Sequence, residues 1–344
     1  MRIGIATPAP PGSRYGNRVT ALRWARILRG LGHSVSVVQS YDGDRFDLLI
    51  ALHAHRSADS ISRFHREHPD KPIVVGLTGT DLYSDLARSA HAQESLKLAT
   101  RIVALQPKAL DALSPRLREK TRVIYQSVAR PSITARNQKA RDSLSDATID
   151  SSLNSSSSSL HRSLSISSHS FDVCVIGHLR PVKDPFRAAM AARMLPASSR
   201  VLVTQVGAAM TEQSAVRARA EMNRNSRYRW VGEHPPRRVR QILERSQLFV
   251  ISSRMEGGAN ALGESIVAGV PALATRIPGS VGILGEDYPG YFEVGDTGGL
   301  AQLMARAEND EQFLAKLKRH CNKLVGLFDP ERETAAWVKL LKEL

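Results

Sequence analysis

Two glutamates, Glu256 and Glu264, stand eight positions apart in the segment 252–265, and a glycine pair follows the first of them. The apolar run Leu248–Ile251 precedes this segment, and a second apolar run covers residues 272–274. The pattern predicts a strand, a glycine turn, a helix and a second strand. It therefore places both carboxylates at the carboxyl edge of a parallel sheet, where open α/β sheets bind ligands.

Carboxylates and helix amides at such an edge suit a phosphorylated sugar. Glu256 and Glu264 can accept hydrogen bonds from sugar hydroxyls. The first amides of the predicted helix 260–268 can bind a phosphate, because they are unpaired and carry the positive end of the helix dipole. The alternative is an ordinary β-α unit with solvated glutamates. The flanking glycines and apolar runs favour the ligand site.

A second candidate site follows the predicted strand 171–176. Gly177 ends this strand, and a loop then presents His178, Arg180 and Lys183 before a helix begins. Cations beside a glycine turn can neutralise a diphosphate as it leaves, when negative charge builds up in the transition state. An ordinary basic loop between a strand and a helix is the alternative.

Strands and helices alternate through most of the chain and position both segments. Helical stretches such as 19–31 and 236–246 separate the predicted strands. This alternation indicates parallel sheets covered on both faces, and we predict two doubly wound, Rossmann-like α/β domains that face a central cleft. The predicted strands are 2–7, 34–39, 46–52, 72–77, 101–105, 171–176, 201–206, 248–251 and 272–275.

Composition narrows the classes of function. The 344 residues suffice for two domains with full cores, 42% of them are hydrophobic, and no apolar run is long enough to cross a membrane. Two distant cysteines, Cys174 and Cys321, predict a reducing, cytoplasmic compartment and no cysteine-built metal site. A net charge of +15 favours anionic partners. Aromatic residues make up only 5% and the arginines are dispersed, so we expect small anionic substrates rather than nucleic acid.

Serine dominates residues 143–170. Such a segment has too few large apolar residues to offset the entropy of ordering it, so we predict a flexible linker or surface insertion, with a phosphorylated regulatory segment as the alternative. A G-x-G-x-x-G fingerprint is missing after every predicted strand, which argues against a nicotinamide or flavin enzyme.

The first half of the chain offers three further segments at predicted strand ends. Residues 12–18 open a helix, and its free amides together with Arg14 and Arg18 can bind a small tetrahedral anion. His53, His55 and Arg56 follow another strand. His55 is either a structural histidine or one that binds an acceptor or handles a proton.

Thr78, Gly79, Thr80 and Asp81 form the third strand-end turn. Asp81 either caps the next helix or takes part in catalysis. No aspartate-rich motif indicates a bound metal, so basic side chains are expected to do what a divalent ion does elsewhere.

Together, the Lys183 loop and the glutamate segment resemble the group-1/family-4 glycosyltransferases, which have the GT-B fold. That family holds a nucleoside-diphosphate sugar with a G-x-L-x-x-x-K loop and an E-x7-E segment. The resemblance implies that Lys183 binds the diphosphate, Glu256 faces the donor sugar and Glu264 holds the ribose hydroxyls. It also implies that backbone amides meet the phosphates at Gly257 and Gly258, and Ala259 and Asn260 are further donor-binding candidates.

One position departs from the family pattern. His178 stands where the family usually has an arginine. Arg180 or Arg254 is expected to supply the missing charge. The catalytic candidates are therefore Glu256, Lys183, Arg254 and His55.

A narrower resemblance involves the segments 7–9, 16–21, 53–58, 77–83, 254–260 and 287–292. They are similar to those of the selenosugar synthases of selenoneine biosynthesis. That resemblance implies transfer of the sugar of UDP-N-acetylglucosamine to selenophosphate, with release of UDP and phosphate and without a cofactor besides the UDP-sugar co-substrate. The acceptor-binding candidates are Gly12, Arg14, Gly16, Asn17, Arg18, His53, His55, Arg56, Thr78, Gly79, Thr80 and Asp81.

Two other functions stay open. One is a transferase of the same fold acting on a lipid-linked or polysaccharide acceptor, without stable membrane insertion. The other is a protein that binds nucleic acid or sugar nucleotides without turnover. The expected organisation is an acceptor-binding domain at 1–136, the serine-rich linker at 137–170, a nucleotide-sugar-binding domain at 171–325 and a terminal helix at 326–344 that crosses back to the first domain.

Overall fold

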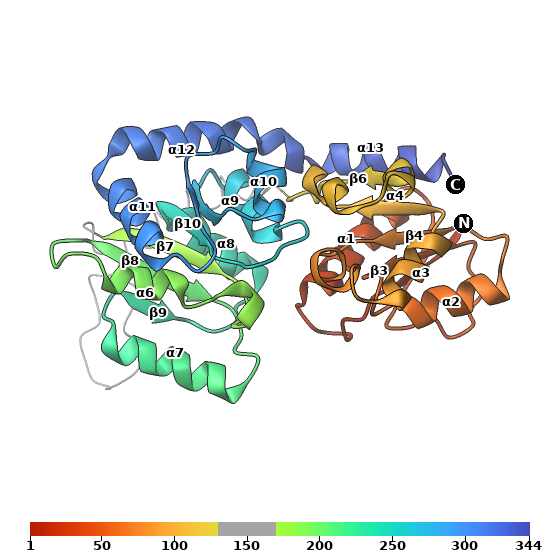
Figure 1. The fold of residues 1–344 in the computed structure, drawn as a ribbon, viewed down its shortest axis with the longest axis horizontal. Coiled ribbons are helices and arrows are strands. Elements are labelled where there is room, and N and C mark those ends of the chain that lie inside the picture. The colour runs from red at the N-terminus through yellow and green to blue at the C-terminus, as the bar shows by residue number, and fades with distance from the viewer. Residues whose placement is uncertain (130–169) are drawn as a thin grey trace, which may run out of the picture.

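Parallel sheets, one in each half of the chain, form the centres of two domains (Figure 1). A computed structural model describes residues 1–129 and 170–344. The serine-rich linker expected at 137–170 therefore lies, apart from its last residue, outside the described residues. Each half of the described chain holds one six-stranded sheet, and every strand pair in both sheets is parallel. The predicted fold class is confirmed.

The N-terminal sheet has the strand order β2-β1-β3-β4-β5-β6. Its central strands are continuous apolar runs, because helices bury both faces. Trp24 and Leu28 of α1 pack on one face, while Ile61 and Phe64 of α2 pack on the other. The elements are β1 (Arg2–Ala6), α1 (Gly16–Gly30), β2 (Ser34–Val38), β3 (Leu48–Leu52), α2 (Ala58–Glu67), β4 (Ile73–Gly76), the π-helix η1 (Asp81–Asp85), α3 (Ala90–Leu98), β5 (Arg101–Ala104), the 3-10 helix η2 (Pro107–Ala112), α4 (Pro115–Glu119) and β6 (Thr121–Val123).

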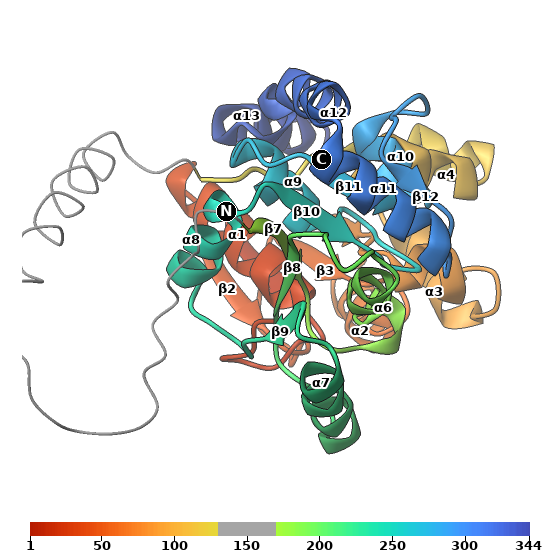
Figure 2. The same cartoon turned by 90° about the vertical axis from the view of Figure 1, so that its left-hand side faces the viewer.

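The C-terminal sheet has the order β12-β11-β10-β7-β8-β9. Figure 2 shows α8 and α9 on one side of this sheet and α6 and α11 on the other. The elements are β7 (Phe171–Ile176), the 3-10 helix η3 (Pro181–Lys183), α6 (Arg187–Arg193), β8 (Val201–Val206), α7 (Glu212–Arg224), β9 (Tyr228–Trp230), α8 (Pro236–Arg245), β10 (Leu248–Ile251), α9 (Asn260–Val267), β11 (Ala272–Thr275), α10 (Pro278–Leu284), β12 (Tyr291–Phe292), α11 (Thr297–Asn309), α12 (Glu311–Lys323), the 3-10 helix η4 (Val325–Phe328) and α13 (Pro330–Leu341).

Both sheets reverse their strand order at one point, and these points determine where ligands can bind. In the N-terminal sheet the order reverses between β1 and β3, and in the C-terminal sheet between β7 and β10. At such a switch point the loops after the two strands diverge to opposite faces, which opens a crevice at their carboxyl ends. The loops after β7 and β10 are the Lys183 loop and the Glu256 segment, so the fold brings the two strongest sequence signals to one crevice.

The strands that the sequence did not predict are short. β6, β9 and β12 have three, three and two residues, and each lies at an edge of its sheet. Runs of this length carry too few residues for a periodic pattern to emerge. None of the helices in residues 1–129 and 170–344 has the length and apolar character needed to cross a membrane.

The last helix of the chain packs on the first domain. Trp337 of α13 is fully buried, and its ring meets that of Trp24 edge-on, with 4.9 Å between the centroids. Glu343, just after the helix, accepts hydrogen bonds from Arg101 and Arg122 at 3.0 and 2.8 Å. The chain thus returns from the C-terminal domain to cover α1 (Figure 1).

We expect Trp337→Ala to lower the free energy of unfolding by about 3–5 kcal/mol, because it removes a fully buried ring and leaves a cavity against Trp24. Chemical denaturation followed by circular dichroism measures the change. Lys339→Ala on the exposed side of the same helix is the control and should change stability by no more than about 0.5 kcal/mol. Equal effects of the two substitutions would contradict the packing of α13.

Candidate active site

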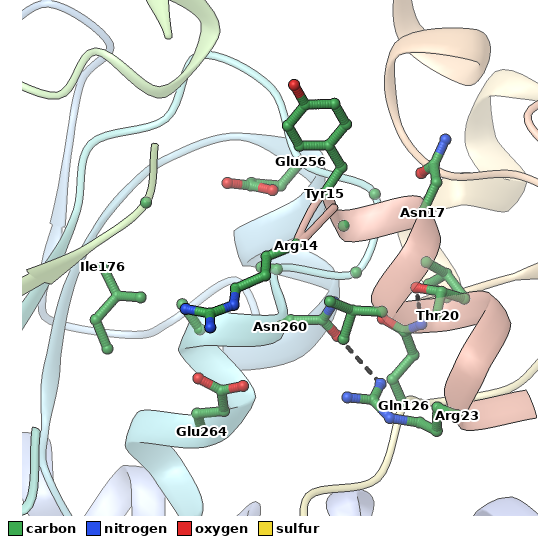
Figure 3. Close-up of a pocket in the computed structure, with 18 of the residues that line it drawn as sticks. Arg14, Tyr15, Asn17, Thr20, Arg23, Gln126, Ile176, Glu256, Asn260 and Glu264 are labelled. Carbon is green, nitrogen blue, oxygen red and sulfur yellow. Dashed lines mark hydrogen bonds between the residues drawn. The ribbon is translucent and has the colours of Figure 1, made fainter. Parts of the chain in front are cut away.

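A cleft of about 1010 Å³ lies between the carboxyl edges of the two sheets (Figure 3). Its N-terminal wall comes from the loop after β1, the start of α1 and the turn after β4. Its C-terminal wall comes from the loops after β7 and β10 and the first turns of α8 and α9. A site between two domains is a common position for small-molecule ligands, because both walls can contribute polar groups.

Glu256 and Lys183 form an ion pair within this cleft. Lys183 Nζ lies 2.5 Å from Glu256 Oε1, which also accepts a hydrogen bond from Ser253 Oγ at 2.6 Å. Glu256 is 9% exposed. The two loops after β7 and β10 thus place one cation and one carboxylate in direct contact at the switch point.

Glycines allow the Glu256 loop to contact backbone on both of its sides. A Cβ on Gly257 would lie 2.4 Å from the carbonyl oxygen of Thr78, and one on Gly279 would lie 2.2 Å from that of Glu256. Gly79 has a φ of +124°, and its Cβ would meet the Gly257 nitrogen at 2.7 Å. Contacts this close exclude any side chain, so the turn after β4 and the Glu256 loop meet through main-chain atoms.

Helix α9 begins in the cleft with an unusual residue. Ala259, its N-cap, has a left-handed φ of 40° and makes no side-chain cap. A non-glycine residue in this conformation stores backbone strain, which concentrates at functional sites. Because no side chain caps the helix, its first amides are available to an anion.

Two side chains on α9 face the N-terminal domain. Asn260 Oδ1 accepts a hydrogen bond from Arg23 Nη1 at 3.2 Å (Figure 3). Glu264 lies one turn further along. Burial raises the pKa of its carboxyl, while the positive charges of Arg23 and Arg240 act in the opposite direction.

The structure shows which of the predicted residues around Lys183 can supply positive charge to the cleft. Gly177, His178, Arg180 and Lys183 line the cleft. His178 Nδ1 accepts the amide of Ala208 at 3.1 Å and therefore carries no proton, which leaves Nε2 to donate to the Arg14 carbonyl at 3.4 Å. The ring is then neutral and cannot replace a positive charge. Arg254 is exposed and lies outside the cleft lining, so Arg180 is the better placed of the two arginines.

On the N-terminal wall, Arg14, Gly16 and Asn17 line the cleft, whereas Gly12 and Arg18 do not. Arg14 reaches across the mouth and donates to the carbonyl of His234 at 2.8 Å. This bond ties the loop after β1 to the segment that precedes α8.

His53 and Thr80 form a hydrogen-bonded pair in the floor of the cleft. His53 is buried with a left-handed φ of 75°. Its Nδ1 accepts the amide of Arg56 at 3.3 Å, and its Nε2 therefore donates to Thr80 Oγ1 at 2.9 Å. Burial lowers the pKa of His53, which keeps this neutral form. The Thr80 hydroxyl is left to donate its own proton to a ligand, and Thr78, Gly79 and Arg56 line the cleft beside it.

Besides Gly12 and Arg18, two more of the predicted acceptor residues do not line the cleft. The exposed His55 lies outside the lining, and its Nδ1 is 2.8 Å from Ser89 Oγ. Asp81 is fully buried. Its carboxylate accepts four backbone amides, from Ala54 (3.1 Å), Thr78 (2.9 Å), Gly79 (2.8 Å) and Leu82 (3.1 Å). A carboxylate used in this way holds the turn 78–80 in shape, which favours the structural alternative for Asp81.

Several polar lining residues went unnoticed in the sequence. On α1, Thr20, Arg23 and Arg26 recur at helical spacing after Asn17, and this spacing is a signal that could have identified a face directed at the cleft. Arg240 belongs to the basic cluster 236–240, for which the sequence favours a solvated face, whereas the structure places it in the cleft lining. Gln126 carries no signal in the sequence, because it reaches the cleft only through the packing of distant segments. No group of three or more histidine, cysteine, aspartate or glutamate side chains in residues 1–129 and 170–344 is arranged to hold a metal ion.

Comparisons with known proteins agree with the architecture. Residues 157–323 match the family model of the glycosyl transferases, group 1. No curated protein matches the chain at a significant level.

Among solved structures, Anabaena Alr3699/HepE in complex with UDP and glucose is 16% identical, with both chains fully covered and a TM-score of 0.71. Sucrose-phosphate synthase from Thermosynechococcus elongatus is 14% identical over 99% of this chain and 98% of that one, with a TM-score of 0.72. The UDP-forming α,α-trehalose-phosphate synthase from Burkholderia vietnamiensis is 14% identical over 96% and 81%, with a TM-score of 0.65.

At these identities the solved structures support the fold alone. The family match covers the segment that contains Lys183, Glu256 and Glu264. The described chain thus has the GT-B fold, and its residues 157–323 match the family model of the group 1 glycosyltransferases.

Proposed function

We propose that the protein transfers a sugar from a nucleoside-diphosphate sugar to an acceptor held by the N-terminal domain. The observation that carries this proposal is the contact between Lys183 and Glu256 at the switch point of the C-terminal sheet, facing the cleft. It is supported by the family match of the segment that contains both residues. Anabaena Alr3699/HepE, which shares the fold, has been solved with UDP-glucose.

The donor occupies the C-terminal wall in this proposal. Lys183 and the uncapped amides at the start of α9 bind the diphosphate, since both present positive charge to the same part of the cleft. Glu256 accepts hydrogen bonds from the sugar, and Glu264, one turn into α9, accepts them from the ribose hydroxyls. A donor that brings its own negative charge competes with Glu256 for Lys183, so donor binding frees the carboxylate for the sugar.

The departing UDP is stabilised by fixed positive groups. Negative charge develops on the diphosphate as the bond to the anomeric carbon breaks, and preorganised donors stabilise such charge most in a site with little water. In this proposal the donors are Lys183, Arg180 and the α9 amides, and no metal ion is required.

We further propose UDP-N-acetylglucosamine as the donor and selenophosphate as the acceptor. The selenium attacks the anomeric carbon, the bond from that carbon to UDP breaks, and a water molecule then cleaves the phosphorus–selenium bond to release phosphate. Arg14, Arg56 and the Thr80 hydroxyl offer the donors that a small tetrahedral anion needs.

This nucleophile suits the residues that the cleft provides. A selenium that is already anionic needs no strong general base, and neither His55 nor Asp81 lies in position to act as one. Catalysis then depends on holding the acceptor in line and on the leaving diphosphate. A lipid-linked or polysaccharide acceptor is the alternative for the same donor chemistry.

We expect Lys183→Ala to reduce the turnover rate by about 100- to 1000-fold, as loss of one charge-stabilising donor does in other enzymes. Glu256→Ala should cause a loss of similar size, because the donor sugar loses its carboxylate partner. Steady-state release of UDP measures both. Lys318→Ala on the exposed face of α12 removes the same charge far from the cleft and should leave the rate unchanged. Full activity in a folded Lys183→Ala variant would refute the donor site.

The acceptor is tested by incubating the protein with UDP-N-acetylglucosamine and selenophosphate and analysing the products by mass. We expect UDP and a selenium-bearing sugar, with less UDP from thiophosphate or phosphate. If no small anionic acceptor releases UDP, the selenophosphate proposal is wrong. Turnover with a lipid-linked or polysaccharide acceptor under the same conditions would then identify the alternative.

A further inference from the structure

Arg23 belongs to the N-terminal domain but contacts the donor wall of the cleft. It lies in the middle of α1, and its guanidinium Nη1 donates to Asn260 Oδ1 at 3.2 Å, across the domain boundary. Asn260 and Glu264 are one turn apart on α9, so their side chains project from the same face of the helix. Figure 3 shows both projecting from α9, with Arg23 opposite them on α1. Arg23 therefore approaches the residue proposed to hold the ribose from the other domain.

Two carboxylates, those of Glu264 and Glu333, lie within electrostatic range of Arg23. Besides Glu264, its positive charge faces Glu333 of α13. Glu333 is buried; its Oε2 accepts the amide of Ser127 at 2.7 Å, and its Oε1 has no hydrogen-bond partner within residues 1–129 and 170–344. Burial lowers the pKa of the Arg23 guanidinium. Arg23 is partly buried, and a cation withdrawn from water is most favourable near opposite charge, as these carboxylates provide.

The positive groups that face Glu264 in residues 1–129 and 170–344 are Arg23 from α1 and Arg240 from α8. The buried thiol of Cys174 on β7 also lies within electrostatic range. A carboxylate in such a position binds hydroxyls best when it is ionised, because the charged form accepts stronger hydrogen bonds. Removing Arg23 is therefore expected to weaken the site even if every donor contact stays in place.

We propose that Arg23 is a positioning residue for the nucleotide donor: it orients Asn260 and places its positive charge opposite Glu264, so that the ribose site on the C-terminal domain is complete only when the N-terminal domain is docked against it. This inference rests on the proposed function, because it assumes that Glu264 meets the donor. It adds a contribution of the N-terminal domain to donor binding.

UDP binding to the full-length protein, measured by calorimetry from about pH 8 to about pH 5, tests the inference without turnover. We expect Arg23→Gln to weaken UDP binding by about 10- to 100-fold near neutral pH, which is the range for loss of a hydrogen bond to a charged group. Without Arg23, the pKa of Glu264 rises further. Affinity in Arg23→Gln should therefore begin to fall at a higher pH during acidification than in the unmodified protein.

Three further variants separate positioning from a structural role. Arg29→Gln removes the same charge from the end of the same helix and should leave the pH profile of binding unchanged. Arg23→Lys keeps the charge and should restore the unmodified profile with part of the affinity. Glu264→Gln cannot ionise, so adding Arg23→Gln to it should produce no further shift in the profile.

The outcomes distinguish this inference from the proposed function. If the unmodified protein does not bind UDP, the proposed function fails. If it binds UDP and a folded Arg23→Gln variant binds with the same affinity and pH profile, the role of Arg23 is refuted while the proposed function stands. A uniform loss of affinity with an unchanged profile also refutes the effect on Glu264.

Discussion

The cleft depends on one close backbone contact, between the turn after β4 and the loop that carries Glu256. Main-chain atoms of the two segments are in contact at Gly79 and Gly257, and Gly279 contacts the main chain of Glu256 in the same loop. No side chain fits at these positions, so the contact sets the distance between the two domains at the floor of the cleft. It thereby fixes where the Thr80 hydroxyl of one domain lies relative to the Glu256 carboxylate of the other. For a reaction between two bound substrates, such fixed proximity lowers the barrier by removing freedom of motion in advance.

In the cleft, each of two cations lies near a carboxylate, and a ligand can interact with both members of each pair. Lys183 is held by Glu256, and Arg23 faces Glu264. Each pair satisfies charges that would be costly to bury singly. In the proposed reaction, the diphosphate takes over the lysine while the sugar hydroxyls take over the carboxylates. The carboxylates thus keep hydrogen-bond partners after the lysine has turned to the diphosphate.

The parts of this molecule that could be predicted are those with local patterns. Apolar runs such as Leu248–Ile251 stand out because a strand buried on both faces needs them, and the glycines beside Glu256 mark the turn that follows. The Lys183 loop could be recognised for the same reason, since it directly follows a strand. The sequence leaves two roles open for Asp81, because only the fold shows that its carboxylate accepts four backbone amides.

Residues that act across the domain boundary were the hardest to predict. His55 and Arg254 have the right chemistry and the right neighbours in sequence, but their side chains are exposed outside the cleft lining. Arg23 and Gln126 are the reverse case. The helical spacing of Arg23 with Thr20 and Arg26 marks a polar face of α1 but not what that face meets, and nothing beside Gln126 in sequence indicates a ligand. Both residues reach the cleft because α1 and the segment after β6 pack near α9, and a local pattern does not record such long-range packing.

The path of α13 has a mechanical consequence. The chain leaves the N-terminal domain just after Val128 and re-enters it just after Phe328, and the amide of Val128 donates to the carbonyl of Phe328 at 3.0 Å. The exit and the return are therefore fastened side by side, at the end of the cleft lined by Ser127 and Pro330. Two chain segments fastened in this way gather the covalent connections between the domains at one place. The bond between Arg14 and His234 adds a non-covalent tie across the mouth, so the two domains are held together at more than one point of the cleft.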